Sequence, residues 1–316
     1  MFDPAIPLLT EAELRIDGVL ESLKQRFIKY DQSYVANACF PERRGVLLGA
    51  YIECQPFLDK AFHLEIRQPG KFFPRLWELH ICSLLLHWGF DVLPRANRKK
   101  SVPDFCIKYG DKRMWVEAVC PDLGDVDAAP AHPDLIPGQL YSRTIDIASD
   151  NRPRVVRASS ALDAKIKKYK ERYLPSGVVS ESDPYIIAVN TNRICYVDST
   201  MVEEQLLYGM GLHQINLKTG EASRQWIPNA VKQSTGNETS IPVAYFLRPE
   251  YKFISACIFS NRWFDFDSNW KEELSGYTQT YFNEGATNPA EWSSFPSKNR
   301  TRSKTTGTQI SLERLV

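Results

Sequence analysis

Hydrophobic residues recur at helical spacing in two segments near the N-terminus. In residues 11–29 they lie three or four positions apart, and Thr10 with Glu13 forms a capping box at the start. A second apolar segment, residues 46–57, is also predicted to be helical. The pattern therefore predicts an N-terminal helical region over residues 1–70.

The central part of the chain alternates between helical and extended patterns. Residues 74–88 predict a helix, because Pro74 suits its first turn and Gly89 ends it. The pattern then predicts, in chain order, strands at residues 90–93, 103–109 and 113–120, a helix at 158–173 and a strand at 184–190. This order of helix, three strands, helix and strand predicts an α/β core with a mixed central sheet over residues 71–192.

Two further regions have less regular patterns. Residues 121–156 are rich in proline, aspartate and alanine, and are expected to form a long insertion loop. Residues 193–316 are predicted to be a strand-rich extension packed on the core. Its strand candidates are residues 241–247, 253–260 and 308–315, and a basic segment occupies residues 298–304.

The composition is that of an ordinary globular protein. The 316 residues are 43% hydrophobic and 24% charged, with a net charge of +1. A chain so close to neutrality has no global basic field, so any binding of nucleic acid must come from a local patch. The seven cysteines include no CxxC pair, which is typical of buried thiols in a reducing cytosol rather than of disulfides or a zinc site.

The N-terminal sequence bears on cellular location. Four acidic residues lie within the first 20 positions, which is not the pattern of a signal peptide. No apolar run approaches the ~20 residues that a membrane helix needs. The sequence therefore predicts a cytoplasmic protein that does not enter a membrane.

The candidate chemistry centres on the two strands joined at residues 110–111. A tight turn at this Gly-Asp pair places Tyr109 opposite Lys112, and the same register places Asp104 opposite Glu117 on one face of the sheet. Cβ atoms of such a pair lie ~5 Å apart. Two carboxylates at this distance repel unless a positive charge lies between them, and a hard divalent cation such as Mg²⁺ meets that need. The alternative is two exposed acids at a sheet edge, but apolar neighbours favour a central hairpin.

A family resemblance rests on the same residues. Pro103 and Asp104 on one strand, the Glu-Ala-Val stretch 117–119 on the next and Glu78 on the preceding helix resemble the PD-(D/E)XK, or restriction-endonuclease-like, nuclease superfamily. In these enzymes a helix supplies a glutamate, and a hairpin supplies an aspartate and a glutamate. The resemblance covers about residues 70–190 and implies a restriction-endonuclease-like αβββαβ core, flanked by the N-terminal helices and the C-terminal strands.

The resemblance also implies a role for each of these residues. Asp104 and Glu117 would bind Mg²⁺ or Mn²⁺, the backbone carbonyl of Ala118 would add a ligand, and Glu78 would bind directly or through water. The ion would assist hydrolysis of a phosphodiester bond. The implied function is an endonuclease acting on DNA, in restriction or another defence role, and cutting both strands would favour a homodimer.

One position departs from the family pattern. The third motif residue is usually a lysine that orients the attacking water, and here it is Val119. In one interpretation the lysine has moved, with Lys165 as the preferred substitute, Lys168 next on the same helix face and Lys100 a weaker choice. In the other, the site is degenerate, and the chain binds nucleic acid or a protein partner without cutting.

Basic residues lie beside the predicted site. The loop at residues 95–101 is suited to phosphate contacts, although a solvated loop explains it equally well. The predicted nucleic-acid contacts are Arg95, Arg98, Lys99, Lys100 and Lys168. A general α/β enzyme with no role on nucleic acids is disfavoured, because the chain has no Gly-rich phosphate loop, GxSxG motif or Cys–His pair.

Overall fold

The computed structural model describes separate stretches of the chain. These are residues 41–95, 102–109, 112–122, 147–194, 200–215, 218–220, 222–234, 237–262, 269–291, 295, 300–306 and 309–315. Several sequence predictions lie outside them: the helix at residues 11–29, the turn at 110–111 and the loop residues Arg98, Lys99 and Lys100.

The described residues form a mixed α/β fold, as the sequence predicts. Their main sheet has eight strands in the order β1-β2-β3-β4-β9-β10-β11-β12. The strands are β1 (Asp91–Val92), β2 (Phe105–Tyr109), β3 (Lys112–Val119), β4 (Tyr185–Asn190), β9 (Ile254–Ser260), β10 (Thr278–Phe282), β11 (Arg300–Thr306) and β12 (Gln309–Leu315). Strand β2 is antiparallel to both of its neighbours, β1 and β3, whereas β3, β4 and β9 are parallel. The β9–β12 segment thus continues the sheet of the predicted core.

The parallel strands lie at the centre of the molecule. Every residue of β4 and β9 is buried, which is usual for parallel strands covered on both faces. Their runs of β-branched and other apolar residues, YIIAVN and ISACIFS, explain both the extended conformation and the burial.

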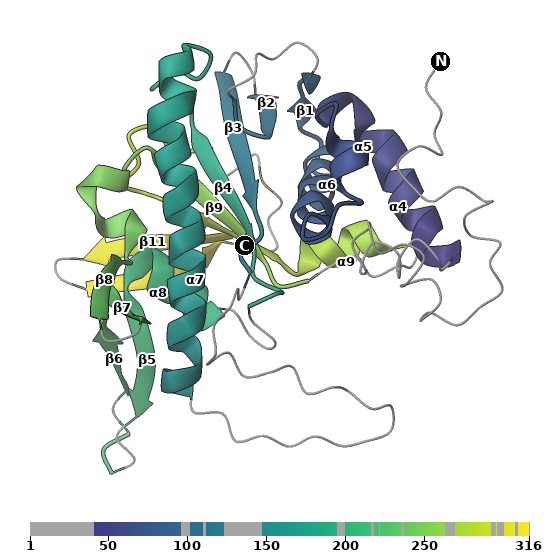
Figure 1. The fold of residues 1–316 in the computed structure, drawn as a ribbon. Helices are drawn as coiled ribbons and strands as arrows, with labels where there is room; N and C mark the ends of the chain where they lie inside the picture. The colour runs from purple at the N-terminus through teal and green to yellow at the C-terminus, as the bar shows by residue number, and fades with distance from the viewer. Residues whose placement is uncertain are drawn as a thin grey trace, which may run out of the picture.

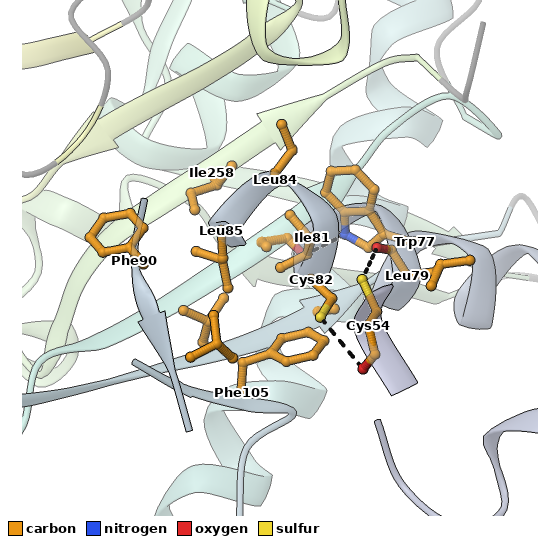
Figure 2. Close-up of a cluster of buried hydrophobic side chains, with 14 of the residues drawn as sticks. Cys54, Trp77, Leu79, Ile81, Cys82, Leu84, Leu85, Phe90, Phe105 and Ile258 are labelled. Carbon is orange, nitrogen blue, oxygen red and sulfur yellow. Dashed lines mark hydrogen bonds between the residues drawn. The ribbon is translucent and has the colours of Figure 1, made fainter. Parts of the chain in front are cut away.

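One face of the sheet is covered by helices from the N-terminal half, together with α9 (Figure 1). These elements are α4 (Pro41–Cys54), the 3₁₀ turn η1 (Gln55–Phe57), α5 (Phe62–Glu65), α6 (Phe72–His87) and α9 (Trp270–Gly276). Figure 2 shows apolar side chains of α6 packed towards the sheet. The indole of Trp77 donates a hydrogen bond to the carbonyl oxygen of Ala188 on β4, at 2.9 Å, and so fixes α6 against the sheet.

The opposite face is covered by α7 and α8, with two small hairpins beside them (Figure 1). These elements are α7 (Ile147–Lys168), the π-helical turn η3 (Tyr169–Tyr173), the 3₁₀ turn η4 (Leu174–Ser176), α8 (Thr200–Tyr208), β5 (Met210–Ile215), β6 (Ala222–Trp226), β7 (Asn229–Ser234), β8 (Asn237–Pro242) and the 3₁₀ turns η5 (Tyr245–Leu247) and η6 (Pro249–Tyr251). Because α6 and α7 lie on opposite faces, a site that uses both must lie where strands of the sheet end or separate.

Two sequence predictions are wrong in part. Residues 147–156, predicted to belong to a loop, form the first turns of α7. Pro153 and the polar residues around it hide the helical pattern in the sequence, although Val155 and Leu162 form part of a buried helix face. The strand predicted at residues 241–247 ends at Pro242, which has no N–H to donate to a partner strand. Ala244 then adopts a left-handed conformation with φ of 61° that ends the extended chain.

The glycine after α8 is predicted to be essential for packing as well as for conformation. Gly209 has φ of +68°, and a Cβ there would lie 2.9 Å from the indole nitrogen of Trp226 and 3.1 Å from Cβ of Ala244. Gly177 has nearly the same φ, +69°, but nothing lies within 4 Å of its added Cβ. A left-handed alanine costs about 1 kcal/mol, and overpacking adds about 1–3 kcal/mol. Gly209→Ala should therefore lower the free energy of unfolding more than Gly177→Ala does.

Urea denaturation followed by circular dichroism measures this difference directly. Gly177→Ala serves as the control for backbone conformation alone. Equal losses in the two variants would show that the contacts around Gly209 relax without cost, contrary to the prediction.

Candidate active site

The hairpin register predicted from the sequence is confirmed. Tyr109 lies opposite Lys112, and the pairing continues to Phe105 opposite Val116. The ladder therefore ends one residue before Asp104 and Glu117 would pair, at the point where β2 begins. Both acids lie at this end of the hairpin, on strands held by an apolar core.

Asp104 lies where β2 and β3 cease to pair. Its Oδ2 accepts a hydrogen bond from the backbone N–H of Ala118, at 2.8 Å, which replaces a ladder bond at this point. Its Oδ1 lies 3.8 Å from Nη1 of Arg95. Burial and the charge of Glu117 raise the pKa of the Asp104 carboxyl, and the positive charge of Lys165 opposes the shift. Asp104 is thus a nearly buried carboxylate fixed by the backbone of the strand that carries the second acid.

Glu117 is the most enclosed charge of the site. Its side chain has no exposed surface. Its Oε1 accepts hydrogen bonds from Nζ of Lys165 at 2.6 Å and of Lys168 at 3.0 Å, and its Oε2 accepts one from the hydroxyl of Tyr173 at 2.8 Å. Burial alone would raise the pKa of this carboxyl, but the two lysines outweigh it and hold the pKa below its usual value. Glu117 is therefore ionised and anchors the end of α7.

Lys165, the residue that the sequence suggests as a moved lysine, lies beside Glu117, and its catalytic role stays a prediction. Its ammonium binds Glu117, and the negative charges of Glu117, Asp104 and Glu78 together hold its pKa above the usual value, although burial opposes them. Lys168 was predicted to contact nucleic acid; it also binds Glu117, and 36% of its side chain is exposed. Val119 packs at the edge of the core under α7, on the same face as Glu117. Two lysines from a helix thus lie near the site, while the strand position carries valine.

Tyr173 reaches Glu117 because the helix widens at its C-terminal end, where residues 169–173 form one turn of π-helix. In a regular α-helix Lys165 and Arg172 would share a face, and Tyr173 would point ~100° away from it. The additional residue of the π turn moves Tyr173 onto that face. Such turns are frequent at functional sites. Tyr173 was not predicted as a site residue, because the helical period of the sequence gives no sign of the π turn.

Glu78 approaches the site from α6. Its Oε2 accepts a hydrogen bond from Nη1 of Arg75 at 2.5 Å, and 17% of its side chain is exposed. Burial and the charge of Asp104 raise the pKa of Glu78 to about 8, although Arg75 and Lys165 oppose this shift. The carboxylates of Glu78 and Asp104 therefore repel each other, and a proton or a cation between them would relieve that repulsion.

The donor chemistry of the site fits a hard cation, although the described residues include no group of three histidine, cysteine, aspartate or glutamate side chains already arranged around a metal position. Carboxylate and backbone carbonyl oxygens are the ligands that Mg²⁺ and Mn²⁺ prefer. The pKa of the Lys165 ammonium is raised by the negative charges of all three acids, Glu117, Asp104 and Glu78. A divalent ion that bound these acids would have to displace Lys165 from Glu117.

Arg95 is the one predicted loop contact within the described residues. Its Nη1 donates to the carbonyl oxygen of Asp104 at 2.8 Å, and 22% of its side chain is exposed. It thus supports the backbone that carries Asp104, and its role in binding DNA stays a prediction.

Comparison with protein-family models, with characterised proteins and with solved structures found no match. Among the described residues, no helix combines the length and the apolar character needed to cross a membrane.

Proposed function

We propose that this chain is a metal-dependent endonuclease with a restriction-endonuclease-like core, and that it hydrolyses phosphodiester bonds of DNA. The observation that carries the proposal is the position of Lys165. Its Nζ lies 2.6 Å from Oε1 of the buried Glu117, and the charges of Asp104 and Glu78 also raise its pKa. A lysine beside such acids supplies the group that the motif lacks at Val119.

The arrangement of elements supports the proposal. In chain order α6, β1, β2, β3, α7 and β4 give helix, three antiparallel strands, helix, and a strand parallel to β3. This is the αβββαβ order that the resemblance implies. The acids lie on β3 and at the start of β2, with Glu78 on the preceding helix.

Each group has a defined task in this proposal. Asp104, Glu117 and the carbonyl oxygen of Ala118 would hold Mg²⁺ or Mn²⁺, with Glu78 beside them. When bound, the ion would lower the pKa of a water and stabilise charge on the phosphate. The ammonium of Lys165 would orient the attacking water and stabilise the developing negative charge. Lys168, which is more exposed, would contact a neighbouring phosphate.

A second function is favoured by one observation. Both oxygens of Glu117 already have partners, Lys165 and Lys168 on one and Tyr173 on the other. The same contacts are expected of a buried ion cluster whose only role is to anchor α7. In that case the chain binds nucleic acid or a protein partner without cutting.

Plasmid cleavage distinguishes the two functions. We expect the wild-type chain to nick supercoiled plasmid DNA in Mg²⁺ or Mn²⁺ and to lose this activity in EDTA. Asp104→Ala should be inactive in both, because it removes a proposed ligand. Equal inactivity of the two proteins, with binding retained in a gel-shift assay, would reject the endonuclease and support the binding protein. Gel filtration of the complex with DNA tests the proposed homodimer.

A further inference from the structure

A second group of charged side chains surrounds Arg75 and includes Glu78. Arg75, one turn earlier on α6, holds three carboxylates with one guanidinium. Its Nη1 donates to Asp59 at 2.7 Å and to Glu78 at 2.5 Å, and its Nε donates to Glu65 at 3.0 Å. Only 13% of the Arg75 side chain is exposed. Several charge-assisted bonds therefore fix the guanidinium in one position.

Two of these carboxylates belong to the segment that connects α4 with α6. Glu65 is the last residue of α5, and Asp59 follows the 3₁₀ turn η1. Asp59 is itself fixed, because its Oδ1 accepts a hydrogen bond from the N–H of Ala61 at 2.8 Å. The guanidinium also lies over the ring of Phe62, 5.7 Å from its centroid. The segment between α4 and α6 thus fixes the position of the Arg75 guanidinium. The guanidinium in turn fixes the position of the Glu78 carboxylate.

We infer that Arg75 is a positioning residue that holds the Glu78 carboxylate towards the metal position, and that the segment of Asp59 and Glu65 is thereby part of the active site. The inference rests on the proposed function, since it requires that Glu78 take part in binding a metal. Glu78 stands on the α6 face of the sheet, whereas Lys165 approaches from the α7 face. A glutamate side chain has several freely rotating bonds, so a fixed hydrogen bond limits where its carboxylate can lie.

Groups that orient metal ligands have a measurable effect. Loss of such a partner typically weakens metal binding or activity about 10–100-fold. Arg75→Met should accordingly weaken Mn²⁺ binding by about 10–100-fold in isothermal titration calorimetry of the full chain. Arg75→Lys keeps the charge but loses the planar fork of donors, so it should also bind Mn²⁺ more weakly than wild type.

A control variant separates this effect from the loss of any ion pair at the α4–α6 face. Lys271 on α9 pairs with Glu53 on α4, with Nζ 2.6 Å from the nearer carboxylate oxygen. This pair touches none of the site residues. Lys271→Met should leave Mn²⁺ affinity unchanged.

A double-mutant cycle with Glu78→Gln tests whether Arg75 acts through Glu78. In the Glu78→Gln background, changing Arg75 should alter Mn²⁺ affinity by less than about threefold, because the side chain to be positioned is no longer a charged ligand. An equal loss in both backgrounds would overturn the inference, since Arg75 would then act on the fold alone. If circular dichroism shows that Arg75→Met is unfolded, Arg75→Lys replaces it in the double-mutant cycle.

The remaining outcomes separate this inference from the proposed function. Wild-type affinity in both Arg75 variants would overturn the inference and leave the endonuclease proposal standing. A wild-type chain that binds no Mn²⁺ would overturn both.

Discussion

Lys165→Met is expected to slow metal-dependent cleavage of DNA by about 10²–10³-fold, the usual cost of removing one group that stabilises developing charge. The ammonium of Lys165 binds Glu117 at 2.6 Å, and 21% of the side chain is exposed, so it is close to the acids and still reaches the solvent side of the site. Methionine has a similar length and no charge. Single-turnover cleavage of a labelled duplex in excess enzyme measures the chemical step without product release.

Lys168→Met is the matched control, since this residue binds the same oxygen of Glu117 at 3.0 Å. If Lys168 mainly contacts a phosphate, its loss should weaken DNA binding and reduce the dependence of binding on salt, with little effect on the single-turnover rate. A large rate loss in Lys168→Met with an unaffected Lys165→Met would show that the catalytic lysine was assigned to the wrong residue. Equal small losses in both would favour the ion cluster that only anchors α7.

Local patterns made the hairpin predictable from sequence. The Gly-Asp pair at residues 110–111 predicts a two-residue turn and with it the register of both strands, and the confirmed register brings Asp104 and Glu117 to the same end of the hairpin. Lys165 was singled out because it lies on the helix that follows the hairpin; its contact with Glu117 is observed, and its catalytic role stays a prediction. In each case the relevant distance along the chain is short, or the geometry is regular.

The features that the sequence did not predict depend on irregular or distant structure. Tyr173 reaches Glu117 through a π turn, whose single additional residue changes the direction of the side chain without leaving a mark in the hydrophobic period. Arg75 meets Asp59 and Glu65 through contacts between helices. Polar side chains that pair this way have no periodic pattern, so their partners are known only once the helices are packed.

Glu117→Gln is expected to give the largest loss of all, about 10⁴-fold in cleavage rate, comparable to removing one member of a catalytic unit. The substitution keeps the shape of the side chain. A glutamine can still accept hydrogen bonds from Lys165 and Lys168 through its oxygen and donate one to the hydroxyl of Tyr173, so the three contacts can survive. What it removes is the negative charge, on which both the bound ion and the two ammonium groups depend.

The same variant should also lose stability in a way that depends on pH. The two lysines hold the pKa of Glu117 below the usual carboxyl value, so its charge stabilises the folded state above about pH 4, and this contribution disappears as pH falls through the lowered pKa. We expect Glu117→Gln to cost about 2 kcal/mol at pH 7, less than a fully buried pair, because both lysines reach solvent. The difference from wild type should shrink towards pH 3.

Melting temperatures with and without Mn²⁺ then decide between the two functions of Glu117. If the residue is a metal ligand, Mn²⁺ should raise the melting temperature of the wild-type chain and have little effect on Glu117→Gln, because a ligand that binds only the folded state stabilises it by mass action. If Glu117 serves only to anchor α7, the variant still loses stability at pH 7, but Mn²⁺ shifts neither protein. A loss of stability by itself is therefore common to both functions, and the response to metal is what separates a nuclease centre from a buried ion cluster.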